Sequence, residues 1–129
     1  MGDGAARFAV DLIRGKPAAE NKIIAGGIAM IRHIVMWKFK PVAEGATKEE
    51  NLRKVKALLE ALPETVPLIR RMEVHLNENP NPKNYDAVLI SEFDSLDDLA
   101  AYTKHPAHQK ISSFVALCRE GRASADYTF

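Results

Sequence analysis

The chain has 129 residues, of which 47% are hydrophobic and 27% charged, with a formal net charge of +1. This length allows one domain with one core, and the balance of 18 Lys and Arg against 17 Asp and Glu predicts no nucleic-acid partner. Its apolar runs are too short to cross a bilayer, so no membrane contact is predicted. The single cysteine, Cys118, cannot form an internal disulfide, and we expect a cytoplasmic protein with this thiol in its core.

Residues 1–29 differ in pattern from the rest of the chain. A short amphipathic segment at residues 5–13 favours a helix, which a Gly and a Pro then end, and no signal-peptide pattern is present. Two hypotheses account for this extension. In the first, Met30 is the natural start and the extension is a translated leader, because codons for the preceding Ala-Gly-Gly can contain a ribosome-binding stretch. In the second, it is an arm that packs on the domain or its partner.

A domain at residues 30–129 opens with a predicted strand, IRHIVMWKFK, over residues 31–40. Its two faces carry His33, Val35, Trp37 and Phe39 on one side and Ile34 and Met36 on the other. A strand that is apolar on both sides is covered on both sides.

A first helix is predicted to begin at Thr47, because Thr47 and Glu50 form a capping box. Apolar residues then recur at helical spacing as far as Pro63, which ends the pattern; they are Leu52, Val55, Leu58, Leu59 and Leu62. Residues 69–76 alternate apolar and charged side chains, which predicts an edge strand with one wet face. His75 on that face is interpreted as a surface histidine.

A third strand is predicted over residues 85–93, again with apolar residues on both faces. A second helix begins near Ser95 and turns Leu96, Leu99 and Tyr102 inward. Pro106 suits the first turn of a further helix, whose buried stripe is Ala107, Ile111, Phe114, Val115 and Cys118. Gly121 is expected to close that helix, and residues 123–129 form the last strand.

The predicted order of elements is β-α-β-β-α-β, an α+β protomer with the ferredoxin-like split pattern. Helices cover one face of a four-stranded sheet in this topology. The apolar second face of the first and third strands then needs another apolar surface, and the simplest source is the same face of a second copy. The pattern therefore predicts a homodimer.

Four segments together resemble the stress-responsive dimeric A/B-barrel (Dabb) family. They are IRHIVMWKFK, YDAVLISEFDSLDDLAAY, HPAHQK and ADYTF, and the resemblance covers residues 30–129. It implies two ferredoxin-like protomers packed sheet to sheet as a dimeric α/β barrel. Members are mostly small proteins linked to stress responses, without an assigned biochemical activity.

One plant branch of that family is a polyketide cyclase that works without cofactor or metal. The resemblance matches its catalytic Tyr and His to Tyr102 and His108, and a pocket His on its first strand to His33. Where that branch has a further pocket His on the third strand, this sequence has Ala87. This difference argues against the cyclisation reaction of the plant branch in this protein.

The topology allows a small apolar cavity between sheet and helices. We expect His33, Val35 and Trp37 to line it as ligand-binding residues, with Tyr102 and His108 as a catalytic pair acting on a small hydrophobic carbonyl compound. A neutral His can take a proton from a carbon acid, and a Tyr hydroxyl can hydrogen-bond the resulting enolate. The activity would be that of a cyclase, isomerase or lyase.

The competing interpretation is structural, and the sequence alone favours it. Tyr102 would be a core aromatic residue with a satisfied hydroxyl, and His108 would fasten the junction of two helices. The protein would then have a cavity but would catalyse no reaction.

No metal or cofactor is predicted. His105 and His108 have His-x-x-His spacing, but Pro106 interrupts the helix between them and no third ligand has suitable spacing. Nucleotide-binding and nucleophile motifs are missing from the sequence.

Overall fold

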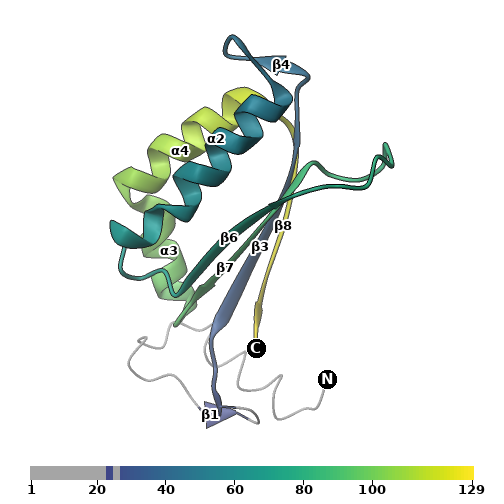
Figure 1. Cartoon of the computed structure of the whole chain (residues 1–129). Coiled ribbons are helices and arrows are strands. Elements are labelled where there is room, and N and C mark those ends of the chain that lie inside the picture. Colours follow the sequence, from purple (N-terminus) through teal and green to yellow (C-terminus); the bar gives the residue numbers. More distant parts are fainter. Residues whose placement is uncertain (1–22, 25–26) are drawn as a thin grey trace.

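The computed structural model describes residues 23–24 and 27–129 of the chain (Figure 1). The helix expected at residues 5–13 lies outside them, so both hypotheses for the extension stay predictions. The described strands of the main sheet are β3 (Ile31–Phe39), β6 (Arg71–Leu76), β7 (Ala87–Phe93) and β8 (Arg119–Thr128). The helices are α2 (Lys48–Glu60), η2 (Leu62–Glu64), α3 (Leu96–Lys104) and α4 (Pro106–Cys118). Two small hairpins pair β1 (Ile23–Ile24) with β2 (Gly27–Ile28) and β4 (Val42–Ala43) with β5 (Ala46–Thr47).

The main sheet is antiparallel throughout, in the order β6-β7-β3-β8. Its helices all lie on one side, and the other side of the sheet is left open among the described residues (Figure 1). The β-α-β-β-α-β order and the one-sided helix layer confirm the predicted ferredoxin-like α+β protomer.

Helix α2 begins as predicted. The Thr47 hydroxyl accepts the Glu50 N–H at 3.2 Å, and the Glu50 carboxylate accepts the Thr47 N–H at 3.0 Å. Just before it, Glu44 and Gly45 have positive φ angles of 51° and 73°. This left-handed pair forms the tight turn of the β4–β5 hairpin, and Gly supplies that conformation without strain.

The junction between α3 and α4 is sharp, and it determines where the site lies. The His105 imidazole accepts the Ala107 N–H at 3.0 Å, and Pro106 is the first residue of α4, as predicted. A proline at this position loses no helical hydrogen bond, because the first N–H groups of a helix have no partner within it. Tyr102 in the last turn of α3 therefore lies beside His108 in the first turn of α4.

The core lies between sheet and helices, as the alternation in the first and third strands predicts. From β3 and β7 it takes Ile31, Val35, Trp37, Phe39, Ala87, Leu89 and Phe93, and from the helices Leu52, Val55, Leu59, Leu99, Tyr102, Ile111, Val115 and Cys118. Cys118 is fully buried, as expected.

Edge strand β6 is protected by helix α2. The Glu60 carboxylate accepts the Val74 N–H at 3.0 Å, and the Lys56 ammonium donates to the Val74 carbonyl at 2.6 Å. The same two side chains also pair with each other at 2.9 Å. An edge whose backbone groups are occupied in this way is a poor template for a further strand.

Three sequence predictions about element ends were wrong. Helix α4 ends at Cys118, so Gly121 does not close it but lies inside β8, which begins four residues earlier than expected. Helix α2 ends at Glu60, and Pro63 lies in the short η2 helix that follows. Leu58, one of the apolar residues at helical spacing, is 39% exposed and faces a surface pocket between α2 and α4. Strand pairing with β3 overrides the tendency of a glycine to end a helix.

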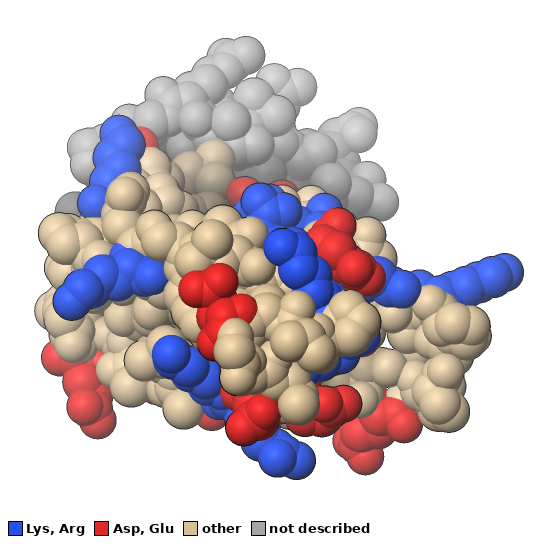
Figure 2. All heavy atoms as spheres, turned by 90° about the horizontal axis from the view of Figure 1, so that it is seen from above, with Lys and Arg blue, Asp and Glu red and all other residues tan. Residues whose placement is uncertain are grey.

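The molecule seen end-on in Figure 2 carries Lys and Arg side chains interspersed with Asp and Glu, and neither sign gathers over that face. Among the described residues, no helix is long and apolar enough to span a membrane.

Trp37→Ala is expected to lower the free energy of unfolding by about 3–5 kcal/mol, because it empties a large site in the core. Trp37 is 6% exposed. Urea denaturation followed by circular dichroism measures the loss, and Val42→Ala on the exposed β4–β5 hairpin is the control, expected within about 0.5 kcal/mol of wild type. Strong iodide quenching of the single tryptophan in the folded protein would contradict this placement.

Candidate active site

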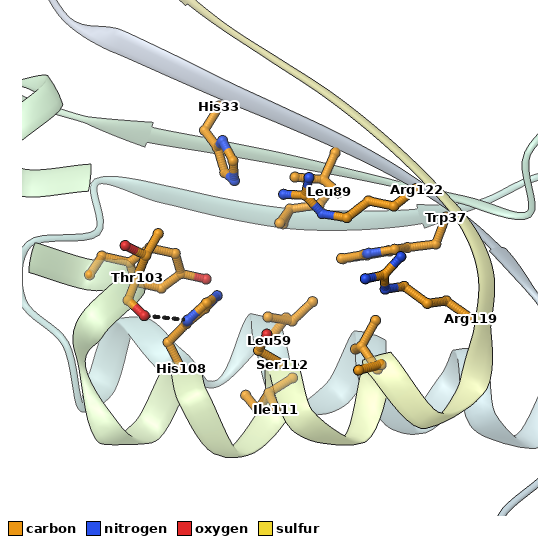
Figure 3. Close-up of a pocket in the computed structure, with 14 residues that line it drawn as sticks. His33, Trp37, Leu59, Leu89, Thr103, His108, Ile111, Ser112, Arg119 and Arg122 are labelled. Carbon is orange, nitrogen blue, oxygen red and sulfur yellow. Dashed lines mark hydrogen bonds between the residues drawn. The ribbon is translucent and has the colours of Figure 1, made fainter. Parts of the chain in front are cut away.

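A cavity of about 140 Å³ lies between strands β3, β7 and β8 of the sheet and helices α2, α3 and α4. All five residues singled out in the sequence line it, namely His33, Val35 and Trp37 from β3, Tyr102 from α3 and His108 from α4 (Figure 3). Leu59, Leu89, Ile111 and Val115 complete its apolar wall, and Thr103, Ser112, Ala116, Arg119 and Arg122 add to its rim. The structure thus brings the predicted residues together, while their roles remain predictions.

Tyr102 carries an unpaired polar atom next to the cavity. Its side chain is 1% exposed, and its hydroxyl makes no hydrogen bond to any residue that the structure describes. Burial raises the pKa of this phenol, so it is a protonated donor at neutral pH. A buried hydroxyl without a partner costs free energy. The structural interpretation expected a satisfied hydroxyl, and the fold supplies no partner from residues 27–129.

His108 packs against Tyr102, with the ring centroids 4.5 Å apart and the rings inclined at 56°. Its Nδ1–H donates to the Thr103 carbonyl at 2.9 Å, which leaves Nε2 as the free ring nitrogen (Figure 3). Burial lowers the pKa of His108, and the nearby His33 and Arg122 lower it further. The imidazole is therefore neutral at pH 7, with its Nε2 lone pair available as a base.

His33 faces the cavity from the sheet, and Asp126 orients it. Its Nδ1 lies 2.5 Å from the Asp126 carboxylate, on the neighbouring strand β8. The two residues are direct partners in the β3–β8 register, so they share one face of the sheet. The carboxylate accepts from Nδ1–H and thereby fixes the orientation of the ring, with Nε2 directed towards the cavity (Figure 3).

Sequence reasoning missed Asp126, Arg119 and Arg122 as site residues. The motif containing Asp126 was recognised, but its place opposite His33 depends on the pairing register, which one sequence does not reveal. The two arginines were missed because β8 was predicted to begin only at residue 123. The available signal was the period-2 alternation that runs back from Asp126 through Ser124 to Arg122.

The two histidines with His-x-x-His spacing have separate tasks. His105 caps α4 and His108 donates to the Thr103 carbonyl. In the part of the chain that the structure describes, no group of three or more His, Cys, Asp or Glu side chains is placed to hold a metal ion.

Residues 31–129 match the model of the stress responsive A/B barrel domain family. The chain belongs to this family. Among solved structures, it is similar to a dimeric protein of unknown function with a ferredoxin-like fold from Bacteroides fragilis, with 38% identity and a TM-score of 0.68 over 78% of this chain and 96% of that one. No protein with a curated description matches it.

Two more distant structures share the fold of this A/B barrel domain. One is a dimeric ferredoxin-like protein of unknown function from Thermobifida fusca, with 22% identity and a TM-score of 0.67 over 78% of this chain and 92% of that one. The other is a hydroxynitrile lyase from Passiflora edulis, with 17% identity and a TM-score of 0.64 over 78% and 93%. At these identities, each similarity shows a shared fold and nothing about function.

Tyr102→Phe is expected to leave the A/B barrel domain as stable as wild type or to stabilise it by about 1 kcal/mol, since it removes a buried hydroxyl that has no protein partner. Urea denaturation measures the change. Tyr127→Phe is the matched control, because the Tyr127 hydroxyl accepts a hydrogen bond from Arg32 at 3.2 Å. A loss of about 1–3 kcal/mol in Tyr102→Phe would instead favour the structural interpretation.

Proposed function

We propose that this A/B barrel domain binds a small carbonyl compound in the cavity and catalyses proton transfer at the carbon next to the carbonyl. The observation that carries the proposal is the buried Tyr102 hydroxyl, which has no partner among the described residues and lies beside His108. A ligand oxygen would satisfy this donor. A core that needed only packing would be served equally well by phenylalanine at this position.

His108 is the proposed general base. Its neutral Nε2 takes a proton from the α-carbon, and the electron pair of the broken C–H bond moves into the carbonyl to form an enolate. The Thr103 carbonyl holds the Nδ1–H at 2.9 Å and stabilises the imidazolium that forms. Return of the proton to the same carbon, or to another, completes an exchange or an isomerisation without any cofactor.

Tyr102 is the proposed hydrogen-bond donor to the enolate oxygen. Because burial raises the pKa of the phenol, it donates without losing its proton. Surroundings of low polarity, made by Leu89, Ile111 and Phe93, strengthen such a bond, and no water has to reorganise when charge develops.

The fold is compatible with this chemistry. A hydroxynitrile lyase from Passiflora edulis has the same fold, so an enzyme can be built on it. At 17% identity that likeness transfers no substrate, and the proposal rests on the cavity of this chain.

The proposed functional unit is a homodimer that pairs the open faces of two sheets. That face carries Ile34 and Met36 from β3, Val88 and Ile90 from β7, and Ala123 and Ala125 from β8, in mutual register. Met36 is 37% exposed, which is unusual for an apolar side chain in the middle of a sheet. The similar Bacteroides fragilis protein, described as dimeric, supports the same assembly.

Wild-type protein is expected to speed the exchange of the methyl hydrogens of acetophenone for deuterium in D₂O, followed by ¹H NMR. Tyr102→Phe and His108→Gln should each slow that exchange by about 10²-fold or more, because each removes one partner of the transfer. The wild-type rate should also fall as the pH is lowered through the depressed pKa of His108. Tyr127→Phe, outside the cavity, is the control. If the exchange is no faster than in buffer, the proposed proton transfer is wrong and only ligand binding in the cavity is left.

Light scattering at micromolar concentration is expected to give twice the chain mass of 14.3 kDa. Met36→Asp should give a folded monomer, because it places a charge on the open face without touching the core. Val42→Asp, on the exposed hairpin, should remain dimeric. A monomeric wild type would contradict the assembly.

A further inference from the structure

We propose that the end of the cavity formed by Arg119 and Arg122 binds a carboxylate, so that the ligand is a small keto acid with its carbonyl directed towards Tyr102 and His108. This inference rests on the proposed function and adds the substrate class. The two arginines lie at the opposite end of the cavity from the Tyr102–His108 pair, and both guanidinium groups reach towards its interior (Figure 3).

The position of Arg122 follows from the register of the sheet. Arg122 pairs with Trp37, so its side chain leaves β8 on the helix-covered face of the sheet, which also carries the Trp37 side chain. Arg119 is the C-cap of α4 and at the same time the first residue of β8. Both guanidinium groups are thus attached to regular structure rather than to a loop.

Neither arginine is neutralised by a carboxylate within residues 27–129. Arg32, Arg70 and Arg71 pair with acidic side chains at 2.5–2.9 Å. By contrast, Arg122 donates only to the Ser124 hydroxyl at 3.2 Å, and Arg119 has no hydrogen bond or ion pair among the described residues. Asp126, which shares the face of β8 with Arg122, is held by His33. Glu120 lies between the two arginines at the register shift of β8, and it forms no ion pair with either of them in the described structure. Two uncompensated positive charges therefore face one small cavity, which favours an anion.

The electrostatic effect of Arg122 reaches the far end of the cavity. Burial is the main cause of the lowered pKa of His108, and the positive charge of Arg122 lowers this pKa further. A ligand carboxylate at Arg122 would offset this effect and restore basicity to His108 on binding. Anchoring and proton transfer are coupled in this way without direct contact between the two ends.

The size and lining of the cavity restrict the rest of the ligand. A cavity of about this volume holds a benzene-sized molecule. Its middle is apolar, with Leu59, Leu89, Ile111 and Val115. The ligand that fits is therefore a short acid with an apolar body and a carbonyl at its other end. A planar carboxylate suits the guanidinium group, which can bind it through two parallel hydrogen bonds.

The test compares two probes of nearly equal shape, 4-oxopentanoate and its amide, 4-oxopentanamide, by isothermal titration calorimetry with wild-type protein. The anion is expected to bind at least about tenfold more tightly than the amide at low salt. That ratio should shrink when NaCl is raised to about 0.5 M. It should also fall towards one in Arg119→Gln and Arg122→Gln. Because the salt arm uses wild-type protein, the inference stays testable even if a variant folds poorly.

Arg53→Gln is the matched control, because Arg53 is an exposed arginine of α2 that, like Arg119, has no ion pair within the described part of the chain. It should keep the full preference for the anion. Equal affinity for the two probes, or no measurable binding of either, overturns the inference. So does tighter binding of inorganic phosphate than of the keto acid, which would assign the arginines to another anion.

The two proposals fail separately. Preference for the anion without exchange of its α-hydrogens in D₂O would refute the proton-transfer function and leave the carboxylate site standing. Exchange of acetophenone hydrogens without any preference for the anion would refute the carboxylate site and leave the function standing.

Discussion

The structure depends on one strand that must be covered on both faces. β3 lies inside the sheet between β7 and β8, and its side chains alternate between the helix layer and the open face. One set, from Ile31 to Phe39, closes the core. The other, Ile34 and Met36, lies on the face of the sheet that the described residues leave open. The same alternation places His33 and Trp37 in the cavity, so the core, the proposed dimer face and the candidate site all follow from the register of nine residues.

The cavity holds two polar side chains in apolar surroundings. The Tyr102 hydroxyl and the His108 imidazole are held where burial shifts the pKa of each towards its neutral form. This keeps a donor and a base side by side without a charge on either, and a charged pair would be costly in the same place. Their positions come from the α3–α4 junction, where Pro106 and the His105 cap impose a sharp turn. Local helix-capping chemistry therefore determines the geometry of the candidate site.

Most of the fold could be predicted from the sequence, because its signals are local. The capping box at Thr47, the proline at the start of α4 and the alternation in β3, β6 and β7 each determine an element from a few neighbouring residues. The five predicted site residues do share one cavity, since strand alternation and helix periodicity show which way they face. Asp126 and Arg122 could not be identified as site residues from local signals, because the strand partner of each is fixed by a register between strands some 90 residues apart in the sequence. The prediction for the end of α4 was wrong for a similar reason. Local propensity assigns the residues after Cys118 to the helix, but they pair with β3 as the first part of β8.

Helix α4 passes into β8 with no loop between them, since Cys118 ends the helix and Arg119 begins the strand. The register against β3 already shifts by one residue at Lys38 and Phe39. A residue inserted here would have to unwind the helix or slip the strand, and a slip would carry Arg122 and Asp126 to the opposite face. Relatives that evolve to bind other ligands are thus restricted, on the side of the cavity formed by α4 and β8, to exchanging side chains at fixed backbone positions. Changes in length are left to the distant β6–β7 and β4–β5 connections, where the chain can grow without disturbing the cavity.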